Sequence, residues 1–199
     1  NDVKSLEKIT KNKDIIAISN NINDNVSDML QLTEDLLDIS RTSTGSISID
    51  RKSKLDPMQT IDRSIALCSS FAKRKNVRIK NIAKFEVRII KLDPKRLRQI
   101  IVNTITKLII TSKKESLIEI NIEEFTSDNQ EKLRILIKSN SDHALLDNKP
   151  NTEMKGNSAS SFLNNDLKNT KDLVNLMDGV FEMEIKKKEW CVIKLTFKY

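Results

Sequence analysis

The sequence predicts an α+β fold, in which a separate helical segment precedes a mixed sheet that has helices on one face. Near the N-terminus, apolar residues recur at heptad spacing, which indicates a long bundle or coiled-coil helix. Asp-Pro occurs at Asp56-Pro57 and at Asp93-Pro94, each time before a stretch with helical periodicity. Several later stretches alternate apolar and polar residues, as strands do. The order of these signals gives the fold class.

The N-terminal heptad pattern is sustained over more than three heptads. Its seam consists of Ile15, Ile18, Ile22, Asn25, Met29, Leu32, Leu36 and Ile39, and Gly45 supplies a helix stop. A strict seam is narrower than the apolar stripe of a globular helix, and a polar residue such as Asn25 is a known means of fixing register and partner number. We therefore expect residues 1–45 to form a homodimer, while a helix that lies on its own domain is the alternative.

The second domain, residues 46–199, is expected to contain both helices and strands. The helix from Asp56 presents Ile61, Ile65, Cys68 and Ala72, and the helix from Asp93 presents Leu97, Ile100, Ile101, Ile105 and Leu108. Strands are expected at 77–79, 87–89, 117–122, 133–137, 181–185 and 192–197, with a hairpin turn at 126–131. Residues 140–161 form one long polar loop, and a last helix through Leu167, Val174 and Met177 ends at Asp178-Gly179.

Composition excludes several classes of protein. At ordinary usage, near ~7%, a chain of this length has roughly 14 glycines, whereas this one has three, so it carries no glycine-rich phosphate loop. No stretch approaches the roughly 18 apolar residues of a membrane span. The single histidine, His143, excludes a His-rich metal site, and Cys68 and Cys191 lack metal-ligand spacing. We expect both cysteines to be small core residues in a reduced compartment.

Four stretches, taken together, resemble the core of sensor histidine kinases, and the shortest of them is LDP at residues 55–57. Residues 36–45 are LLDISRTSTG, similar to the family's LLDxSRxxxG at the end of the second dimerisation helix. Residues 93–103 are DPKRLRQIIVN, similar to the start of the helix that carries the N box, and residues 171–179 are KDLVNLMDG, similar to KKLVELMGG. The resemblance implies a dimerisation segment followed by a Bergerat, or GHKL-like, ATPase domain. This domain is a two-layer α/β sandwich with a lid-like loop, here at about 140–162.

The resemblance also locates a metal site. In the family, the N box has a polar residue and, four residues later, an asparagine, so that both reach a Mg²⁺ that bridges the ATP phosphates. These positions are Asn103 and Lys107 here. An ammonium group has three donors, no acceptor and the same sign of charge as the metal. We therefore expect no metal at this site.

The glycine boxes of the family are replaced as well. The aspartate of its DxGxG box accepts a hydrogen bond from the adenine amino group, and the box maps onto residues 140–144, where both glycines are absent. Asn140 offers an amide oxygen there; alternatively, a shifted loop brings Asp142 to the same place. The GLGL box maps near residues 164–167, where Asp166 is expected to cap the last helix. The implied, degenerate nucleotide site thus consists of Asn103, Lys107, Asn140 and Asp142.

The phosphorylated histidine of the family lies in an HExRTPL motif on the first dimerisation helix, and nothing similar occurs here. We expect no catalytic residue in the chain, since His143 falls in the other domain. The leading hypothesis is a two-component signalling protein with a pseudokinase core and no cofactor. It dimerises through its N-terminal helix and docks a partner histidine kinase or a response regulator. It is expected to be cytoplasmic, by itself or as part of a membrane-anchored sensor, with no membrane contact in these residues.

Two other functions stay open. The chain is alternatively a divergent ATP-binding histidine kinase that phosphorylates a histidine elsewhere, with Lys107 replacing part of the charge of Mg²⁺; ATP and Mg²⁺ enter only under this hypothesis. The net charge of +7 and runs such as Lys73-Arg74-Lys75 and Lys186-Lys187-Lys188 also suggest a nucleic-acid surface. The eight aromatic residues fall mostly in expected core strands and offer no stacking platform, so we expect no nucleic-acid partner.

Overall fold

The computed structural model describes residues 48–84, 88–141, 159–186 and 189–199, and of residues 159–166 it describes only the backbone. Residues 49–199 form one compact unit. The predicted dimerisation segment, Asp142, His143 and most of the predicted loop lie outside the described residues. The long N-terminal helix therefore stays a prediction.

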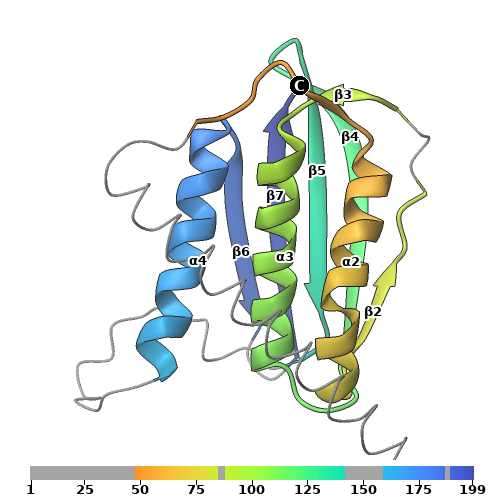
Figure 1. Ribbon diagram of the computed structural model, residues 1–199, viewed down its shortest axis with the longest axis vertical. Helices are drawn as coiled ribbons and strands as arrows, with labels where there is room; N and C mark the ends of the chain where they lie inside the picture. The colour runs from red at the N-terminus through yellow and green to blue at the C-terminus, as the bar shows by residue number, and fades with distance from the viewer. Residues whose placement is uncertain (1–47, 85–87, 142–158, 187–188) are drawn as a thin grey trace, which may run out of the picture. The chain divides into compact units, whose positions relative to one another are not determined.

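A mixed sheet forms one layer of the unit (Figure 1). Its strands, in spatial order, are β2 (Arg78–Asn81), β4 (Leu117–Ser127), β5 (Gln130–Ser139), β7 (Trp190–Lys198) and β6 (Val180–Lys186). Strand β2 runs parallel to β4, and the other neighbouring strands of this described sheet are antiparallel. A small second sheet pairs β1 (Lys54–Leu55) with β3 (Ile90–Lys91). The prediction of a mixed sheet is confirmed.

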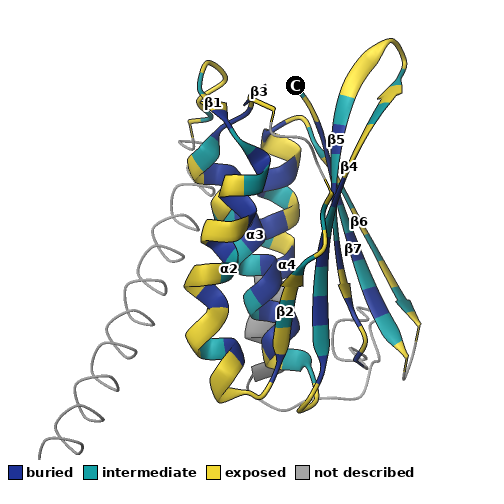
Figure 2. Ribbon diagram, turned by 90° about the vertical axis from the view of Figure 1, so that its right-hand side faces the viewer, coloured by how far each residue is buried: buried dark blue, intermediate teal, exposed yellow. Residues whose placement is uncertain are grey.

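Helices form the second layer. They are α2 (Pro57–Arg74), α3 (Pro94–Thr111) and α4 (Ala159–Leu176). Figure 2 shows all three on the same face of the sheet, while no described helix covers the opposite face. This arrangement confirms the predicted α+β class with helices on one face.

Both predicted Asp-Pro helix starts are confirmed. The Asp56 carboxylate accepts hydrogen bonds from the N–H groups two and three residues further on, at 2.9 and 3.3 Å. Asp93 does the same at the start of α3, at 2.9 and 3.0 Å. An aspartate there satisfies N–H groups that have no partner within the helix, and the proline that follows fixes the first φ. These starts are therefore set by local chemistry.

The hydrophobic core lies between the two layers. The apolar positions predicted for α3 have no exposed surface; they are Leu97, Ile100, Ile101, Ile105 and Leu108. Opposite them lie strand residues such as Ile120, Ile135 and Ile193, which are also fully buried. Cys68 and Cys191 are free, buried thiols, as predicted. Burial raises the pKa of the Cys68 thiol to about 11 and that of the Cys191 thiol to about 12.

Two strand boundaries differ from the prediction. The hairpin turn consists of Asp128 and Asn129, with φ of 55° and 57°, so the strands extend into most of the stretch predicted as a turn. Two successive positive φ values are those of a type I′ turn, which matches the twist of the strands. The strand expected at 87–89 lies further along the chain, as β3 at Ile90–Lys91. Arg88 and Ile89 are exposed, and Ile90 is the buried position.

The start of α4 also differs from the prediction. The helix begins at Ala159, within the stretch predicted as a loop. Asp166 therefore lies inside the helix and does not cap it, so that prediction is wrong. The serines and asparagines of this stretch favour turns locally, and such propensities are weak enough for the fold to override. The end of α4 is as predicted, with Asp178 at φ 55° and the Gly179 N–H bonded to the Val174 carbonyl at 2.9 Å.

Candidate functional site

The two N-box positions lie one turn apart on α3. Asn103 is half-buried, whereas Lys107 is only 2% exposed. The neighbouring helix positions Ile105 and Leu108 have no exposed surface at all. The structure therefore places an ammonium group at an interior position, where a charge costs free energy that only polar contacts offset.

The end of α3 meets the end of β5, where the adenine loop is expected. The hydroxyl groups of Ser112 and Ser139 lie 3.4 Å apart, and Ser139 is fully buried. The Ser141 hydroxyl accepts the N–H of Lys113 at 2.9 Å. These contacts bring the predicted N-box helix and the first residues of the predicted adenine loop together.

Asn140 bonds with the start of β4 through both its backbone and its side chain. Its side-chain oxygen accepts the N–H of Leu117 at 2.7 Å, and its own N–H bonds to the Leu117 carbonyl at 3.1 Å. The oxygen proposed for adenine thus already has a partner in this structure. Asp142, the other predicted acceptor, lies outside the described residues.

A second feature lies at the opposite end of the sheet, beside the β4–β5 turn (Figure 1). It is a cleft of about 470 Å³. Its walls come from residues 49–51, 91–93, 129–131, 177–178 and 198–199. Segments that are far apart in the sequence therefore meet there, including the chain that enters the compact unit and the turn after α4.

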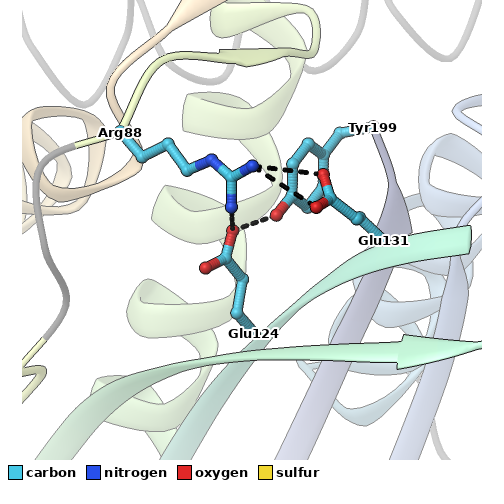
Figure 3. Close-up of polar contacts among 4 residues, drawn as sticks. All are labelled: Arg88, Glu124, Glu131 and Tyr199. Carbon is cyan, nitrogen blue, oxygen red and sulfur yellow. Dashed lines mark hydrogen bonds and ion pairs between the residues drawn. The ribbon is translucent and has the colours of Figure 1, made fainter.

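A polar cluster shares Glu131 and Tyr199 with the walls of this cleft, and Figure 3 shows the cluster. Arg88 donates to Glu124 at 3.0 Å and to Glu131 at 3.3 Å, and its guanidinium lies 5.9 Å from the centre of the Tyr199 ring. The Tyr199 hydroxyl donates to Glu124. Burial and, after it, the hydrogen bond to Glu124 raise the pKa of Tyr199 to about 12. The cluster links the segment before β3 to the hairpin and to the last strand.

Acidic, histidine and cysteine side chains do not cluster as metal ligands in the part of the chain that the structure describes. Among those residues, no group of three or more His, Cys, Asp or Glu side chains is placed to hold a metal ion. None of the described helices is both long and apolar enough to span a membrane.

No protein-family model matches the sequence, and no curated protein matches it. Solved structures do match. The histidine kinase AdeS of Acinetobacter baumannii superimposes with a TM-score of 0.64 over 84% of this chain and 76% of its own, at 11% identity. The catalytic domain of the histidine kinase ThkA gives 0.57 over 76% of this chain and 97% of its own, at 14% identity. Full-length ShkA in complex with AMPPNP superimposes with a TM-score of 0.62 over 86% of this chain and 36% of its own, at 15% identity. This chain has the fold of a histidine-kinase catalytic core.

Within this histidine-kinase fold, the predicted site residues are partly brought together. Asn103 and Lys107 share one face of α3, and Asn140 follows β5, whose last residue contacts the end of that helix. The nucleotide-binding roles that the resemblance gives to these residues stay predictions, as does the role of Asp142.

Sequence reasoning missed the polar groups that join the elements of the histidine-kinase fold. The serines at 112, 139 and 141 and the cluster around Arg88 form contacts between elements. The residues in these contacts lie 27 to 111 positions apart in the sequence. The spacing of residues along the chain does not predict such pairs, because each residue by itself is typical of a solvated turn or of a strand end. Only the register of the strands puts them within reach.

Proposed function

We propose that this chain is a two-component signalling domain that retains the histidine-kinase fold and has lost Mg²⁺-dependent phosphotransfer. It acts by forming a homodimer and by docking a partner histidine kinase or a response regulator in the cytoplasm. The observation that carries the proposal is the burial of Lys107 at the second N-box position.

The physical argument concerns the metal. A Mg²⁺ ion prefers oxygen ligands in near-octahedral geometry, and it bridges the protein to the phosphates of ATP. Lys107 has no acceptor atom and carries a positive charge. Lys107 lies inside α3, near the fully buried Ile105 and Leu108. The family resemblance requires an amide oxygen at this position, and lysine has none.

The adenine side supports the same proposal. The Asn140 oxygen accepts the Leu117 N–H, which is a structural use of the group that would otherwise receive adenine. At the phosphate side, α4 begins at Ala159 and continues through the GLGL position, so helix backbone replaces a glycine turn there. Backbone N–H groups inside a helix are bonded to carbonyls and do not bind phosphate as a helix N-terminus does.

The structural neighbours support a signalling role. AdeS and ThkA are histidine kinases by name, and ShkA is bound to AMPPNP in its structure. Under this proposal, a core of this fold that no longer binds nucleotide acts through the surfaces with which it meets other proteins. Docking is thus the function that the preserved framework supports best.

A divergent kinase is the second candidate, and one observation favours it. Asn103 and Lys107 lie one turn apart on α3, so an ammonium group stands beside a residue that the resemblance assigns to the metal and phosphates. A lysine neutralises phosphate as a point charge without any metal. In this case nucleotide binds and Mg²⁺ contributes little.

Calorimetric titration of the purified chain with AMPPNP separates the two candidates. We expect no binding up to millimolar nucleotide, either with Mg²⁺ or with EDTA. Binding that survives EDTA supports the divergent kinase, and Lys107→Asn then restores a Mg²⁺ requirement while Lys95→Asn, at an exposed position of the same helix, does not. Binding that requires Mg²⁺ in the unchanged protein contradicts both.

Sedimentation equilibrium tests the dimer. The proposal expects the whole chain to be dimeric, because a seam of Ile, Leu and Met buries its apolar positions only against another helix. Ile22→Asp and Leu32→Asp place charges on the seam and are expected to yield monomers. Thr33→Asp changes a neighbouring position outside the seam and serves as the control. A monomeric unchanged chain contradicts this part of the proposal.

A further inference from the structure

The segment with which the chain enters the compact unit, residues 49–53, is bound at two separate points. The N–H of Asp50 donates to the Asp93 carboxylate at 2.9 Å. Arg51 forms an ion pair with Asp178. We propose that these contacts make residues 49–53 a releasable clasp, which couples the path of the incoming chain to both α3 and α4. The proposal deepens the proposed function by naming a regulatory device, and it rests on that function for its biological role.

The first contact reaches α3 through its cap. One oxygen of Asp93 accepts the N–H groups of Lys95 and Arg96, and the other accepts the Asp50 N–H. Asp93 is only 6% exposed, so little water competes for these bonds. A displacement of Asp50 therefore acts directly on the carboxylate that holds the first turn of α3, the helix that carries Asn103 and Lys107.

The second contact reaches the end of α4. Asp178 follows the helix at φ 55°, and its N–H bonds to the Asn175 carbonyl at 3.0 Å. The hydrogen bond from Arg51 and, after it, the charge of Arg51 lower the pKa of the Asp178 carboxyl. Arg51 and Asp178 are 127 residues apart in the sequence, so this pair links the start of the compact unit to the turn after α4.

The clasp has a defined local shape. The Asp50 carboxylate accepts the N–H groups of Lys52 and Ser53, at 2.9 and 3.1 Å, and the Ser53 hydroxyl, at 2.5 Å. Such bonds from an aspartate to the following residues fold the chain into a tight turn. The turn sets the direction of Arg51, which lies between Asp50 and Lys52, while the Asp50 N–H stays available for Asp93.

The second contact, between Arg51 and Asp178, is weak enough to open. The side chains of Arg51 and Asp178 are 64% and 58% exposed. An ion pair this exposed contributes little and is screened by salt. A clasp built from it and from one further hydrogen bond releases under a modest pull on the chain, whereas the buried core between the helices and the sheet stays intact.

Hydrogen exchange of the whole chain, measured by NMR or by mass spectrometry at residue resolution, tests the clasp. In Asp178→Asn the ion pair is lost, and asparagine tolerates the positive φ. We expect the Asp50 amide to exchange up to about fivefold faster, which is the effect of losing an exposed pair. A smaller increase is expected at Lys95 and Arg96, because their N–H groups share the Asp93 carboxylate.

The control is Asp128→Asn. Asp128 also has a φ of 55° and an exposed ion pair, with Lys132, but it contacts no residue of the clasp. It is expected to leave the Asp50 exchange rate unchanged. The double variant Arg51→Asp with Asp178→Arg reverses the pair and is expected to restore protection. Raising the salt from about 0.05 M to about 1 M opens the clasp in the unchanged protein and has little effect in Asp178→Asn.

An Asp50 exchange rate that does not change in Asp178→Asn overturns the clasp. A faster rate at Asp50 without any change at Lys95 and Arg96 overturns the coupling to α3. Both readouts are independent of nucleotide and partner, so they remain valid whether or not the AMPPNP titration supports the pseudokinase proposal.

Discussion

Asn140 and Leu117 exchange two hydrogen bonds at the point where β5 ends and β4 begins. The Asn140 side-chain oxygen accepts the Leu117 N–H at 2.7 Å, and the Leu117 carbonyl accepts the Asn140 N–H at 3.1 Å. The family resemblance places an adenine-binding aspartate at Asn140. In this chain Asn140 extends the strand pairing beyond β5, which gives it a structural role; the nucleotide-binding role stays a prediction.

The role of Asn140 predicts a stability effect. Asn140→Ala is expected to lower the free energy of unfolding by about 1 kcal/mol, because the Leu117 N–H loses its acceptor. Asn140→Asp retains an acceptor oxygen and is expected to cost less. Urea denaturation measures both, with Asn175→Ala at an exposed position of α4 as the control. Equal stability of Asn140→Ala and the unchanged protein contradicts the assignment.

The two helix caps predict losses of stability of different size. Asp56→Ala removes a cap from α2 and is expected to cost about 1 kcal/mol. Asp93→Ala removes the cap of α3 and also the acceptor for the Asp50 N–H, at a buried position, so about 2 kcal/mol is expected. Denaturant midpoints at constant m measure the difference. Equal losses in the two variants mean that the bond to Asp50 contributes nothing.

Gly179 predicts a packing effect. A Cβ atom there meets Phe197 Cδ1 at 2.8 Å, the Thr196 carbonyl oxygen at 2.9 Å and Val174 Cγ1 at 2.9 Å. Gly179→Ala is expected to cost about 1 to 3 kcal/mol, because the β7 backbone yields less easily than a side chain. Thermal unfolding is expected to show a melting temperature lower by several degrees. Val180→Ala, at a position that is 54% exposed, is expected to change it little.

The buried cysteines predict a loss of stability at alkaline pH. Burial raises the pKa of Cys68 from 9.0 to about 11 and that of Cys191 from 9.0 to about 12. The unfolded chain therefore loses these protons first as the pH rises, so this part of the stability is present below pH 9.0 and is lost as the pH rises through the folded-state values. Urea denaturation between about pH 8 and about pH 11 measures the slope. The double variant Cys68→Ala, Cys191→Ala is expected to show a shallower decrease in the free energy of unfolding with pH.

Tyr199 predicts a spectroscopic titration. It is the single tyrosine of the chain, and burial and Glu124 raise its pKa from 10.0 to about 12. Glu124→Gln removes a negative charge beside the phenol and is expected to move the tyrosinate absorbance midpoint toward 10.0. Glu123→Gln, on the neighbouring residue that pairs with Arg134 instead, is the control. Circular dichroism at each pH verifies that the fold is intact, and an unchanged midpoint in Glu124→Gln contradicts the cluster.

The features that depend on neighbours in the chain could be predicted from the sequence. The starts of α2 and α3 follow from Asp-Pro, because a cap and a fixed φ act within one turn. The buried face of α3 follows from its 3.6-residue period, and the hairpin strands follow from alternation. The order of these elements was enough to predict a mixed sheet with helices on one face, and the motifs along it were enough to suggest the histidine-kinase fold.

Which side chains meet and which are buried depends on how the helices and strands pack together. Lys107 appears in the sequence as one more polar position of α3, and its burial results from the layers that close around the helix. Arg51 reaches Asp178, and Asn140 reaches Leu117, because strand register and helix packing bring distant segments together. A hydrogen bond or an ion pair forms within about 3 to 4 Å. The spacing of two residues along the chain determines the distance between their side chains only within a turn or a helix. Contacts between different elements therefore could not be predicted without the tertiary structure.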